Sequence, residues 1–539
     1  MNLRERRAYG LLFGVPLAAV VLFAARFATA LPLTDEWFYT RAAMAMDAID
    51  FLAPGGLTDA VSAFPTWHYD HIVSLPFLIY WPFGECIGFD ARFFVGASIV
   101  LVLAEVLLLR RFMIRSWLWT FPLALLLLNP ARYVEWIWGW MYTVVLSLAL
   151  PLAGLCALST LPGLAKGHLR RCVLAIALIL AGLLCSAGAF FAFPAAVACV
   201  LLQPLPRPAK LRVAAALIVT GVVAFALLTH HEAIHRLAGM RDVWFVLTAL
   251  GAAVLSSPLG LLRFGFDARS ALGGIALLAL VAAVAIAVRR RALSEIAAPL
   301  AVALFGLLSL VPIALARDYL ANYHLHYAAV ALSGAYATAY VLWRRHPSPA
   351  SVSVFGLLCA VVGASLSGAF TGATREGPAY GAYARAVGRY AHDRLEHPQL
   401  LPPYPVGESL DTELILFLSA EQNAVFRDGL AAKGANSAKG AKPLDPRARI
   451  LLAGAQRRLP LQIDREAIPG VSPLIVVLPK STATHHLLAR IGEWPLVLRR
   501  LSPVGAVAPC ADPALACFGG VVLGRKLARG PQPVRFEVP

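Results

Sequence analysis

Long apolar runs separated by short polar connections fill the first 370 residues of the chain. A run of about 20 apolar residues is long enough to cross the hydrocarbon core of a bilayer as a helix. The pattern predicts an all-α polytopic membrane domain with about eleven transmembrane helices. We place these helices at 9–25, 93–109, 116–130, 141–161, 172–186, 188–204, 212–229, 271–288, 295–315, 325–343 and 351–370.

Two further apolar stretches do not fit as full crossings. Segment 72–84 is short and contains Pro76 and Pro82, and segment 243–262 ends in the sequence SSPLGLL. Counting either one as a crossing would invert the orientation of every later connection. We therefore expect both segments to be re-entrant or interfacial helices on the external side, buried against protein.

The basic residues set the orientation of the bundle. They lie at 4–7 and in alternate connections, at 110–115, 166–171, 207–212, 289–291 and 344–345. Cytoplasmic connections carry an excess of Lys and Arg. The pattern predicts a cytoplasmic N-terminus, and an odd number of crossings then leaves the chain from residue 371 on the external side.

The tail, 371–539, has a different pattern. It begins with helical periodicity, continues through a stretch rich in Gly, Ala and Lys at 428–445, and then shows short strand-like runs such as PLIVVLP and PLVLRRL. We expect a small external C-terminal domain of the α/β or mostly β type. The predicted organisation is a transmembrane domain at 1–370 and this external domain at 371–539.

The composition agrees with a membrane protein and excludes several other classes. Hydrophobic residues make up 59% of the chain and charged residues only 14%, which excludes a cytosolic, secreted or disordered protein. The net charge of +17 is accounted for by the basic residues beside the apolar runs. No helix-turn-helix, zinc-finger or RNA-binding signature is present, so we expect no nucleic-acid partner.

Two of the eight cysteines are candidates for a disulfide. The sequence contains no CxxC motif, and five cysteines lie inside apolar runs as small core residues. Cys510 and Cys517 lie in the predicted external tail, on either side of Pro513. A disulfide between them is predicted, because an external compartment permits oxidation and the loop is short.

An acidic pair follows the first apolar run. Asp35 and Glu36 stand in the sequence TDEW, a few residues after that run ends. Carboxylates beside a membrane are costly to bury, so an adjacent pair suggests a function. One of them could act as a general base on an acceptor hydroxyl or coordinate a divalent cation. The alternative is a solvated loop, or a helix N-cap formed by Thr34 or Asp35.

A second polar segment, WHYDH at 67–71, alternates aromatic and polar residues. Trp67 could stack on the apolar face of a sugar, and Asp70 and His71 could bind its hydroxyls. The segment could also be an interfacial aromatic belt. His68, Asp70 and His71 are alternative zinc ligands, but a fourth ligand is missing.

Two arginines lie at the external ends of apolar runs, although basic residues are expected mainly on the cytoplasmic side. Arg317 and Arg26 lie there, and His324 and His326 follow Arg317. A lipid phosphate in the outer leaflet would explain them, because guanidinium binds phosphate through two charge-assisted hydrogen bonds. The alternative is pairing of Arg317 with Asp318 or with lipid headgroups in general.

Two further external residues complete the candidate substrate site. Glu135 stands among aromatic residues in YVEWIWGW, and Tyr327 follows the histidine-rich segment. A separate cluster, HHEAIH at 230–235, has the spacing of a zinc-protease motif. We assign no metal site to it, because no downstream residue stands out as a third ligand and the motif lies in a short connection.

These features in this order resemble the C-type membrane glycosyltransferases, which take sugars from polyprenyl-phosphate donors. In that superfamily a carboxylate of the first external loop is the usual catalytic base, and TDEW at 34–37 looks like that motif. WHYDHIVSLPFLIY, NPARYVEWIWGW and CSAGAFFAFP are similar to segments of largely uncharacterised bacterial members. Those members often have an N-E-H-R-type sequence at 69–72 and an Arg where His326 precedes Tyr327. The resemblance covers roughly residues 1–370.

The resemblance implies a glycosyltransferase of the bacterial inner membrane that acts on the periplasmic face. Its donor would be a polyprenyl-phosphate sugar, and its acceptor an envelope glycan, a lipid or a protein. Asp35, with Glu36 beside it, would deprotonate the acceptor hydroxyl, and a single displacement at the anomeric carbon would invert its configuration. Arg317 with the two histidines, and Arg26, would stabilise the leaving phosphate. No cofactor is predicted, with a divalent cation as the alternative.

Two other classes of function are alternatives. A transporter or flippase for lipid-linked glycans would use the same residues to bind an anionic cargo, and a non-catalytic protein of envelope assembly would work through its tail. Transporters usually show repeated halves or charges at mid-membrane depth. We find no repeat and interpret the spans as free of charge at mid-depth, so the sequence favours the enzyme.

Overall fold

The computed structural model describes two parts of the chain, a long helical part and a set of C-terminal strands. The described residues are 3–33, 36–47, 56–64, 67–68, 71–163, 168–228, 239–257, 266–317, 320–382, 384–385, 449–452, 462–464, 471–479, 486–491, 494–500, 515–523 and 531–537. The chain divides into two compact units. The first unit comprises Met1–Ala28, Thr66–Pro76 and Arg92–Ala382, and the second comprises Thr29–Pro65, Phe77–Ala91 and Tyr383–Pro539.

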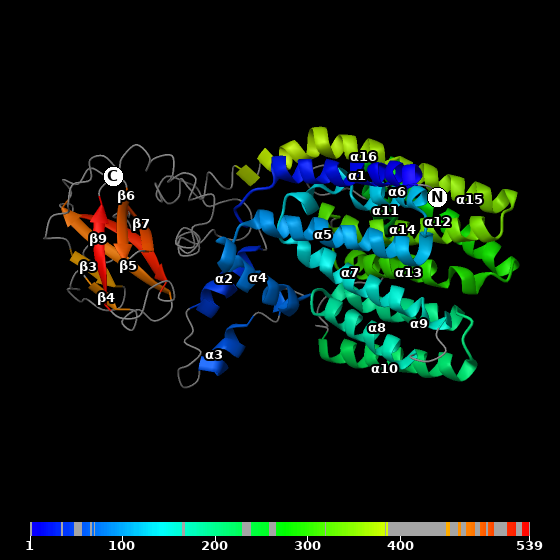
Figure 1. Cartoon of the computed structure of the whole chain (residues 1–539), viewed down its shortest axis with the longest axis horizontal. Helices are drawn as coiled ribbons and strands as arrows, with labels where there is room; N and C mark the ends of the chain where they lie inside the picture. The colour runs from blue at the N-terminus through cyan, green and yellow to red at the C-terminus, as the bar shows by residue number, and fades with distance from the viewer. Residues whose placement is uncertain are drawn as a thin grey trace. The chain divides into compact units, whose positions relative to one another are not determined.

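The first unit is a bundle of helices that lie side by side with nearly parallel axes (Figure 1). Its α-helices are α1 (Leu3–Phe27), α5 (Ala91–Leu109), α6 (Trp117–Leu127), α7 (Met141–Leu158), α8 (His168–Leu183), α9 (Ala192–Leu202), α10 (Arg207–Leu228), α11 (Met240–Leu255), α12 (Ala268–Arg289), α13 (Leu293–Ala316), α14 (Leu325–Arg345), α15 (Pro349–Gly363) and α16 (Ser365–Thr371). Short 3-10 or π turns connect them: η1 (Arg110–Ile114), η2 (Pro130–Trp136), η3 (Leu161–Gly163), η4 (Ala187–Phe191), η6 (Asn322–His324) and η7 (Gly372–Glu376).

Seven helical segments of the described chain are long and apolar enough to cross a membrane. They are Ala91–Ile114, Met141–Leu158, Arg207–Leu227, Ala268–Arg289, Leu293–Leu315, Asn322–Arg345 and Pro349–Ala382. Each overlaps one of the predicted runs, so the prediction of a helical domain with several candidate spans is confirmed. The other four predicted runs also form helices, namely α1, α6, α8 and α9, whose apolar stretches are shorter.

Capping side chains start two of the helices. The Asp267 carboxylate accepts a hydrogen bond from the Ser270 backbone N–H at 2.8 Å and begins α12. The Ser348 hydroxyl accepts one from the Ser351 N–H at 3.2 Å and begins α15, with Pro349 at its first position. Both satisfy backbone donors that a helix N-terminus leaves without an intrahelical partner.

Helix α14 is the core of the first unit. Of the apolar window within Asn322–Arg345, 94% is buried inside the protein. Its neighbour α13 approaches it closely through small residues: a Cβ on Gly334 would meet the backbone of Ala303, and one on Gly306 would meet the backbone of Ala331. Such small-residue contacts let helix backbones approach, which is the usual basis of helix association in membranes.

This contact gives a first prediction. Replacing Gly334 by Ala should lower the free energy of unfolding by about 1–3 kcal/mol, because the added methyl group collides with the backbone of α13 rather than with a flexible side chain. Thermal unfolding in detergent measures the change. Gly356→Ala is the matched control, since a Cβ at Gly356 meets nothing within 4 Å. An equal loss in both variants would contradict this account of the α13–α14 contact.

The two apolar stretches that we expected to be re-entrant are both helical. Most of segment 72–84 lies in α4 (Ser74–Ile87). Residues 243–255 of the other segment lie in α11, which packs within the first unit against α12 and α14, and residues 258–262 lie outside the described residues. Before α4, the residue pairs Trp67–His68 (β1) and His71–Ile72 (β2) form a two-residue antiparallel ladder, with Trp67 opposite Ile72 and His68 opposite His71.

The second unit contains two short helices, most of α4, and a sheet. The helices are α2 (Glu36–Asp47) and α3 (Gly56–Ala63). The sheet has the order β3-β5-β8-β7-β6-β9-β4, and every neighbouring pair is antiparallel. Its strands are β3 (Arg449–Leu452), β4 (Gln462–Asp464), β5 (Val471–Pro479), β6 (His486–Ile491), β7 (Trp494–Arg500), β8 (Leu515–Leu523) and β9 (Pro531–Glu537). Over the described residues, the C-terminal part is therefore the mostly β alternative of the prediction.

Candidate functional site

Glu36, one residue of the predicted catalytic pair, is a buried carboxylate at the start of a helix. It is the first residue of α2, is 0% exposed, and its Oε2 accepts a hydrogen bond from the Leu33 backbone N–H at 2.9 Å. A carboxylate at this position also meets the favourable end of the helix dipole. Through this hydrogen bond, one oxygen of Glu36 fixes the start of α2.

The hydroxyl groups of Thr40 and Tyr80 form a chain of hydrogen bonds that ends at Glu36. The Thr40 hydroxyl donates to the Glu36 backbone carbonyl at 2.9 Å, so the Tyr80 hydroxyl, also 2.9 Å from it, acts as the donor to Thr40. Burial and the charge of Glu36 raise the pKa of Tyr80 well above its ordinary value. Tyr80 therefore stays protonated and stabilises α2 against α4.

Several predicted site residues lie outside the described residues. These are Asp35, Asp70 and Cys510, together with the HHEAIH cluster. Trp67 and His71 are described by their backbone only, in β1 and β2, and Cys517 lies in β8 opposite Val477. The prediction of a Cys510–Cys517 disulfide therefore stays a prediction.

The two arginines of the predicted phosphate site end two helices of the first unit. Arg26 is exposed in the last turn of α1, with its guanidinium carbon 5.5 Å from the centroid of the Phe27 ring. Arg317 is half-buried at the C-terminal cap of α13, where its backbone N–H donates to the Ile313 carbonyl at 2.9 Å. A cation at a helix C-terminus is favoured by the helix dipole.

His324 and Tyr327 are buried on either side of the start of α14. His324 lies in η6, and its Nδ1 accepts a hydrogen bond from the Ala321 backbone N–H at 3.2 Å. The Tyr327 hydroxyl lies 3.4 Å from the Ser186 hydroxyl, and its ring lies against Gly188 of η4. The sequence CSAGAF and the first turn of α14 are therefore in direct contact.

A third polar segment reaches the same region of the first unit. The Leu75 backbone N–H donates to the Leu184 carbonyl at 3.2 Å, and the Tyr142 hydroxyl donates to the Pro76 carbonyl at 2.5 Å. Leu75 and Pro76, in the first turn of α4, thus contact the end of α8, where the sequence CSAGAF begins, and α7.

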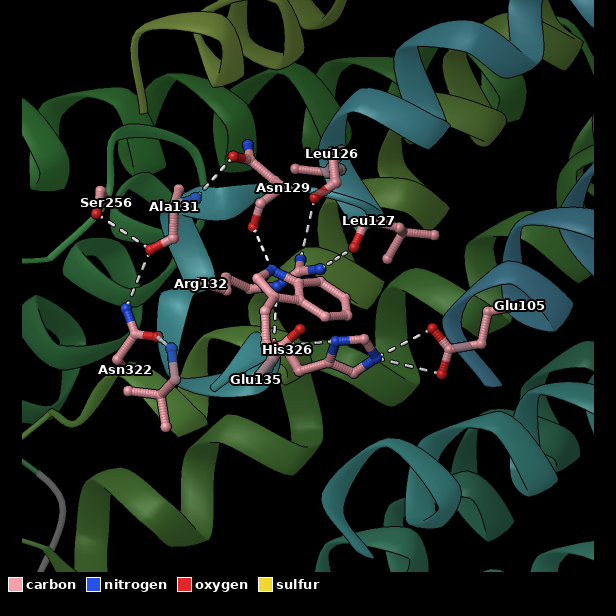
Figure 2. Close-up of polar contacts among 12 residues, drawn as sticks. Glu105, Leu126, Leu127, Asn129, Ala131, Arg132, Glu135, Ser256, Asn322 and His326 are labelled. Carbon is pink, nitrogen blue, oxygen red and sulfur yellow. Dashed lines mark hydrogen bonds and ion pairs between the residues drawn. The ribbon is translucent and has the colours of Figure 1, made fainter. Parts of the chain in front are cut away.

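His326 is the centre of a buried ionic chain that joins three elements (Figure 2). Its Nδ1 lies 3.2 Å from Glu135 Oε1 in η2, and its Nε2 lies 3.0 Å from Glu105 Oε2 in α5. All three side chains are 0% exposed. The predicted phosphate ligand His326 and the predicted substrate ligand Glu135 are thus in contact with each other.

Arg132 extends the chain at its other end. Its Nε lies 2.8 Å from Glu135 Oε1, and its terminal nitrogens donate to the backbone carbonyls of Leu126 and Leu127. Those carbonyls lie in the last turn of α6, whose C-terminal end favours a cation. Figure 2 shows the guanidinium between this helix end and Glu135.

Two asparagines hold the backbone of η2. Asn322 accepts a hydrogen bond from the Val134 N–H at 3.2 Å and donates to the Ala131 carbonyl at 3.1 Å. Asn129 caps the turn by accepting from the Ala131 N–H at 2.9 Å, and it donates to the Ser365 carbonyl at 3.2 Å. The sequence NPARYVEW is therefore a buried, hydrogen-bonded turn rather than an exposed loop.

The charges around Glu135 favour its ionised form. Burial raises the pKa of the Glu135 carboxyl, but the charges of Arg132 and then His326 lower it, and the lowering prevails. Its second oxygen, Oε2, is buried and has no hydrogen-bond donor among the described residues. The carboxylate thus keeps one acceptor position for a proton or for a polar group of a ligand.

The interpretation of the spans as free of charge at mid-depth was wrong. Glu105 lies inside the candidate span Ala91–Ile114, more than two helical turns from either end. In the sequence, Glu105 is the one acidic residue of the apolar run LVLAEVLLL. A single acid in such a run is the signal that could have identified it as a site residue. A carboxylate in such a position pairs with another polar group and marks a functional site by default.

Within the described chain, no group of three or more His, Cys, Asp or Glu side chains is arranged to hold a metal ion. Comparison with protein-family models, curated proteins and solved structures finds no match to this chain. The resemblance to the C-type glycosyltransferases therefore stays a prediction based on the sequence.

Proposed function

We propose that this protein is an integral-membrane glycosyltransferase that transfers a sugar from a polyprenyl-phosphate donor to an envelope acceptor. The observation that carries the proposal is the meeting of polar connecting segments in the first unit. Leu75 in the first turn of α4 contacts Leu184 at the end of α8, the following turn η4 contacts Tyr327, and η2 contacts His326. An active site on one face of a membrane bundle requires that connecting segments from different parts of the chain lie close together.

Asp35 is the proposed catalytic base. Its neighbour Glu36 is already committed to the Leu33 N–H at the start of α2, so we give Glu36 a positioning role. Asp35 would remove the proton of an acceptor hydroxyl as the oxygen attacks the anomeric carbon and the bond to the donor phosphate breaks. The phosphate leaves as an anion, and the configuration of the sugar is inverted.

Arg317, His324 and Arg26 are the proposed phosphate ligands. They lie at the ends of α13 and α1 and in η6, all within the first unit. The contacts of His326 are with two carboxylates, so we leave it out of the phosphate site. The proposed location is a bacterial inner membrane, with the C-terminal sheet in the periplasm.

The test of this site uses polyprenyl phosphate, which every donor of this class releases. Arg317→Ala should weaken its binding to the detergent-solubilised protein by about tenfold or more, since a charge-assisted hydrogen bond is worth roughly 1.5–3 kcal/mol. Arg269→Ala is the matched control, because Arg269 also lies near a helix end of the first unit but is not part of the proposed phosphate site; it pairs with Asp267. Unchanged binding in Arg317→Ala would contradict the phosphate site.

A transporter of lipid-linked glycans is the second candidate, and Glu105 is the observation that favours it. Glu105 pairs with His326 inside a candidate span, and transporters use such pairs of titratable side chains as proton relays. Reconstituted vesicles separate the two functions: a transporter moves the intact lipid-linked sugar across the bilayer, whereas the enzyme breaks the bond between sugar and phosphate.

A further inference from the structure

The buried chain Glu105–His326–Glu135 has a geometry that fixes its number of protons. Each nitrogen of the His326 ring lies within 3.2 Å of a carboxylate oxygen, one from α5 and one from η2. A neutral imidazole has one N–H donor and one lone pair. With two ionised carboxylates, a neutral ring would therefore place its lone pair directly against a carboxylate oxygen.

Two arrangements remove this repulsion, and both contain the same number of protons. Either the ring is an imidazolium that donates to both carboxylates, or the ring is neutral and one carboxyl is protonated and donates to it. Each arrangement holds one proton more than a neutral imidazole and two carboxylates. The proton count therefore follows from the contacts, whichever atom carries the proton.

We propose that Glu105, His326 and Glu135 form a buried proton-binding site that holds this extra proton at neutral pH and thereby clamps η2 to α14 and α5. The ligand is a proton taken up from water, and it returns to water when the site opens. The proposal does not depend on the proposed glycosyltransferase activity.

The charges around the site support it. Arg132 adds a positive charge, so the cluster with the extra proton has a net charge of zero, whichever group carries the proton. Among the described residues, no other ionisable side chain forms an ion pair with these four. Loss of the proton would leave one uncompensated negative charge among side chains that are 0% exposed, which costs several kcal/mol in a protein interior.

Two sets of contacts hold η2 in place. Its backbone is hydrogen-bonded to Asn322 of η6, and its Glu135 side chain contacts His326 of α14. Release of the proton removes the contact between Glu135 and His326 and leaves the hydrogen bonds of Asn322. The extra proton therefore determines how firmly this turn is held within the bundle.

Two substitutions separate a proton clamp from an ordinary set of hydrogen bonds. His326→Gln leaves two carboxylates and one arginine, whereas the double variant His326→Gln with Glu105→Gln leaves one balanced pair. We expect His326→Gln to lower the unfolding temperature by at least about 5 °C at pH 8, as for the loss of one partner of a buried ion pair. The double variant should recover more than half of that loss.

The dependence on pH is the second readout. The folded protein keeps a proton that a free imidazole releases near pH 6.5. Since the folded state then binds more protons than the unfolded state, the stability of the wild type relative to the double variant is complete below about pH 6.5 and falls as the pH rises. A purely structural role of the three side chains would not produce this slope.

His346→Gln is the matched control. His346 also contacts a glutamate, Glu295, at 3.0 Å, but its side chain is 29% exposed. This variant should change the unfolding temperature by less than about 2 °C, since exposed ion pairs contribute little. If the double variant were no more stable than His326→Gln, or if it showed the same pH dependence as the wild type, the proposal would be overturned.

A spectroscopic measurement on the wild type covers the case in which His326→Gln does not fold. The chain has 13 histidines, and ordinary ones are almost entirely neutral by about pH 8. We expect at pH 8 either one remaining imidazolium signal in 15N NMR or one protonated carboxyl band in the infrared spectrum. The absence of both would also overturn the proposal.

Discussion

Replacing Asp35 by Asn should reduce sugar transfer by roughly a hundredfold or more. The asparagine keeps the size and shape of the side chain but cannot accept a proton from the acceptor hydroxyl. Binding of the donor should survive, because its phosphate is held by other groups. The measurement is the initial rate of polyprenyl-phosphate release by the purified variant, compared with the wild type at equal protein concentration.

Two variants sharpen this test. Asp59→Asn changes an exposed carboxylate in the first turn of α3 and should leave the rate unchanged. Glu36→Gln keeps a carbonyl oxygen that can accept from the Leu33 N–H, so it should retain most of the activity. If Glu36→Gln abolished transfer while Asp35→Asn did not, the two roles would have to be exchanged.

Replacing Arg132 by Met should lower the free energy of unfolding by about 3–5 kcal/mol. Arg132 is 0% exposed, pairs with Glu135 and donates to the Leu126 and Leu127 carbonyls. Methionine fills most of the space but leaves the carboxylate of Glu135 and both carbonyls without this donor. Chemical or thermal unfolding in detergent measures the loss.

Arg345→Met is the control for this substitution. Arg345 also pairs with a glutamate, at 3.1 Å, but its side chain is 60% exposed. Its replacement should cost less than about 1 kcal/mol, since water screens an exposed pair. Similar losses in the two variants would show that burial of the Arg132 network does not determine its energy.

The helices of the first unit could be predicted because hydrophobicity alone determines them. Residues 271–288 contain no charge, residues 295–315 contain only Glu295 at their start, and both runs are bounded by arginines; they appear as α12 and α13. The ends of two other helices were harder to predict. Run 116–130 becomes the shorter helix α6, which a 3-10 turn follows, and run 188–204 becomes the shorter helix α9, which a 3-10 turn precedes. Local sequence does not give these helix ends, because they depend on packing.

The buried ionic chain shows where sequence reasoning failed. Glu135 and His326 were predicted as site residues, but as separate ligands on an external face. Their contact joins positions 191 residues apart, and no local pattern gives such a distance. Glu105 and Arg132 carried local signals, a lone acid in an apolar run and an Arg three residues before a Glu. Asn322 carried no signal, since its role follows from the position of the η2 backbone.

The most direct test of the central proposal is an assay of the wild-type protein with radiolabelled polyprenyl-phosphate sugars in lipid vesicles, with cell-envelope extract as the source of acceptor. The proposal predicts that at least one donor is cleaved, that free polyprenyl phosphate is released, and that the sugar reaches the acceptor with inverted configuration. Movement of the intact lipid-linked sugar across the bilayer, with its bond to phosphate unbroken, would contradict the glycosyltransferase and support the transporter.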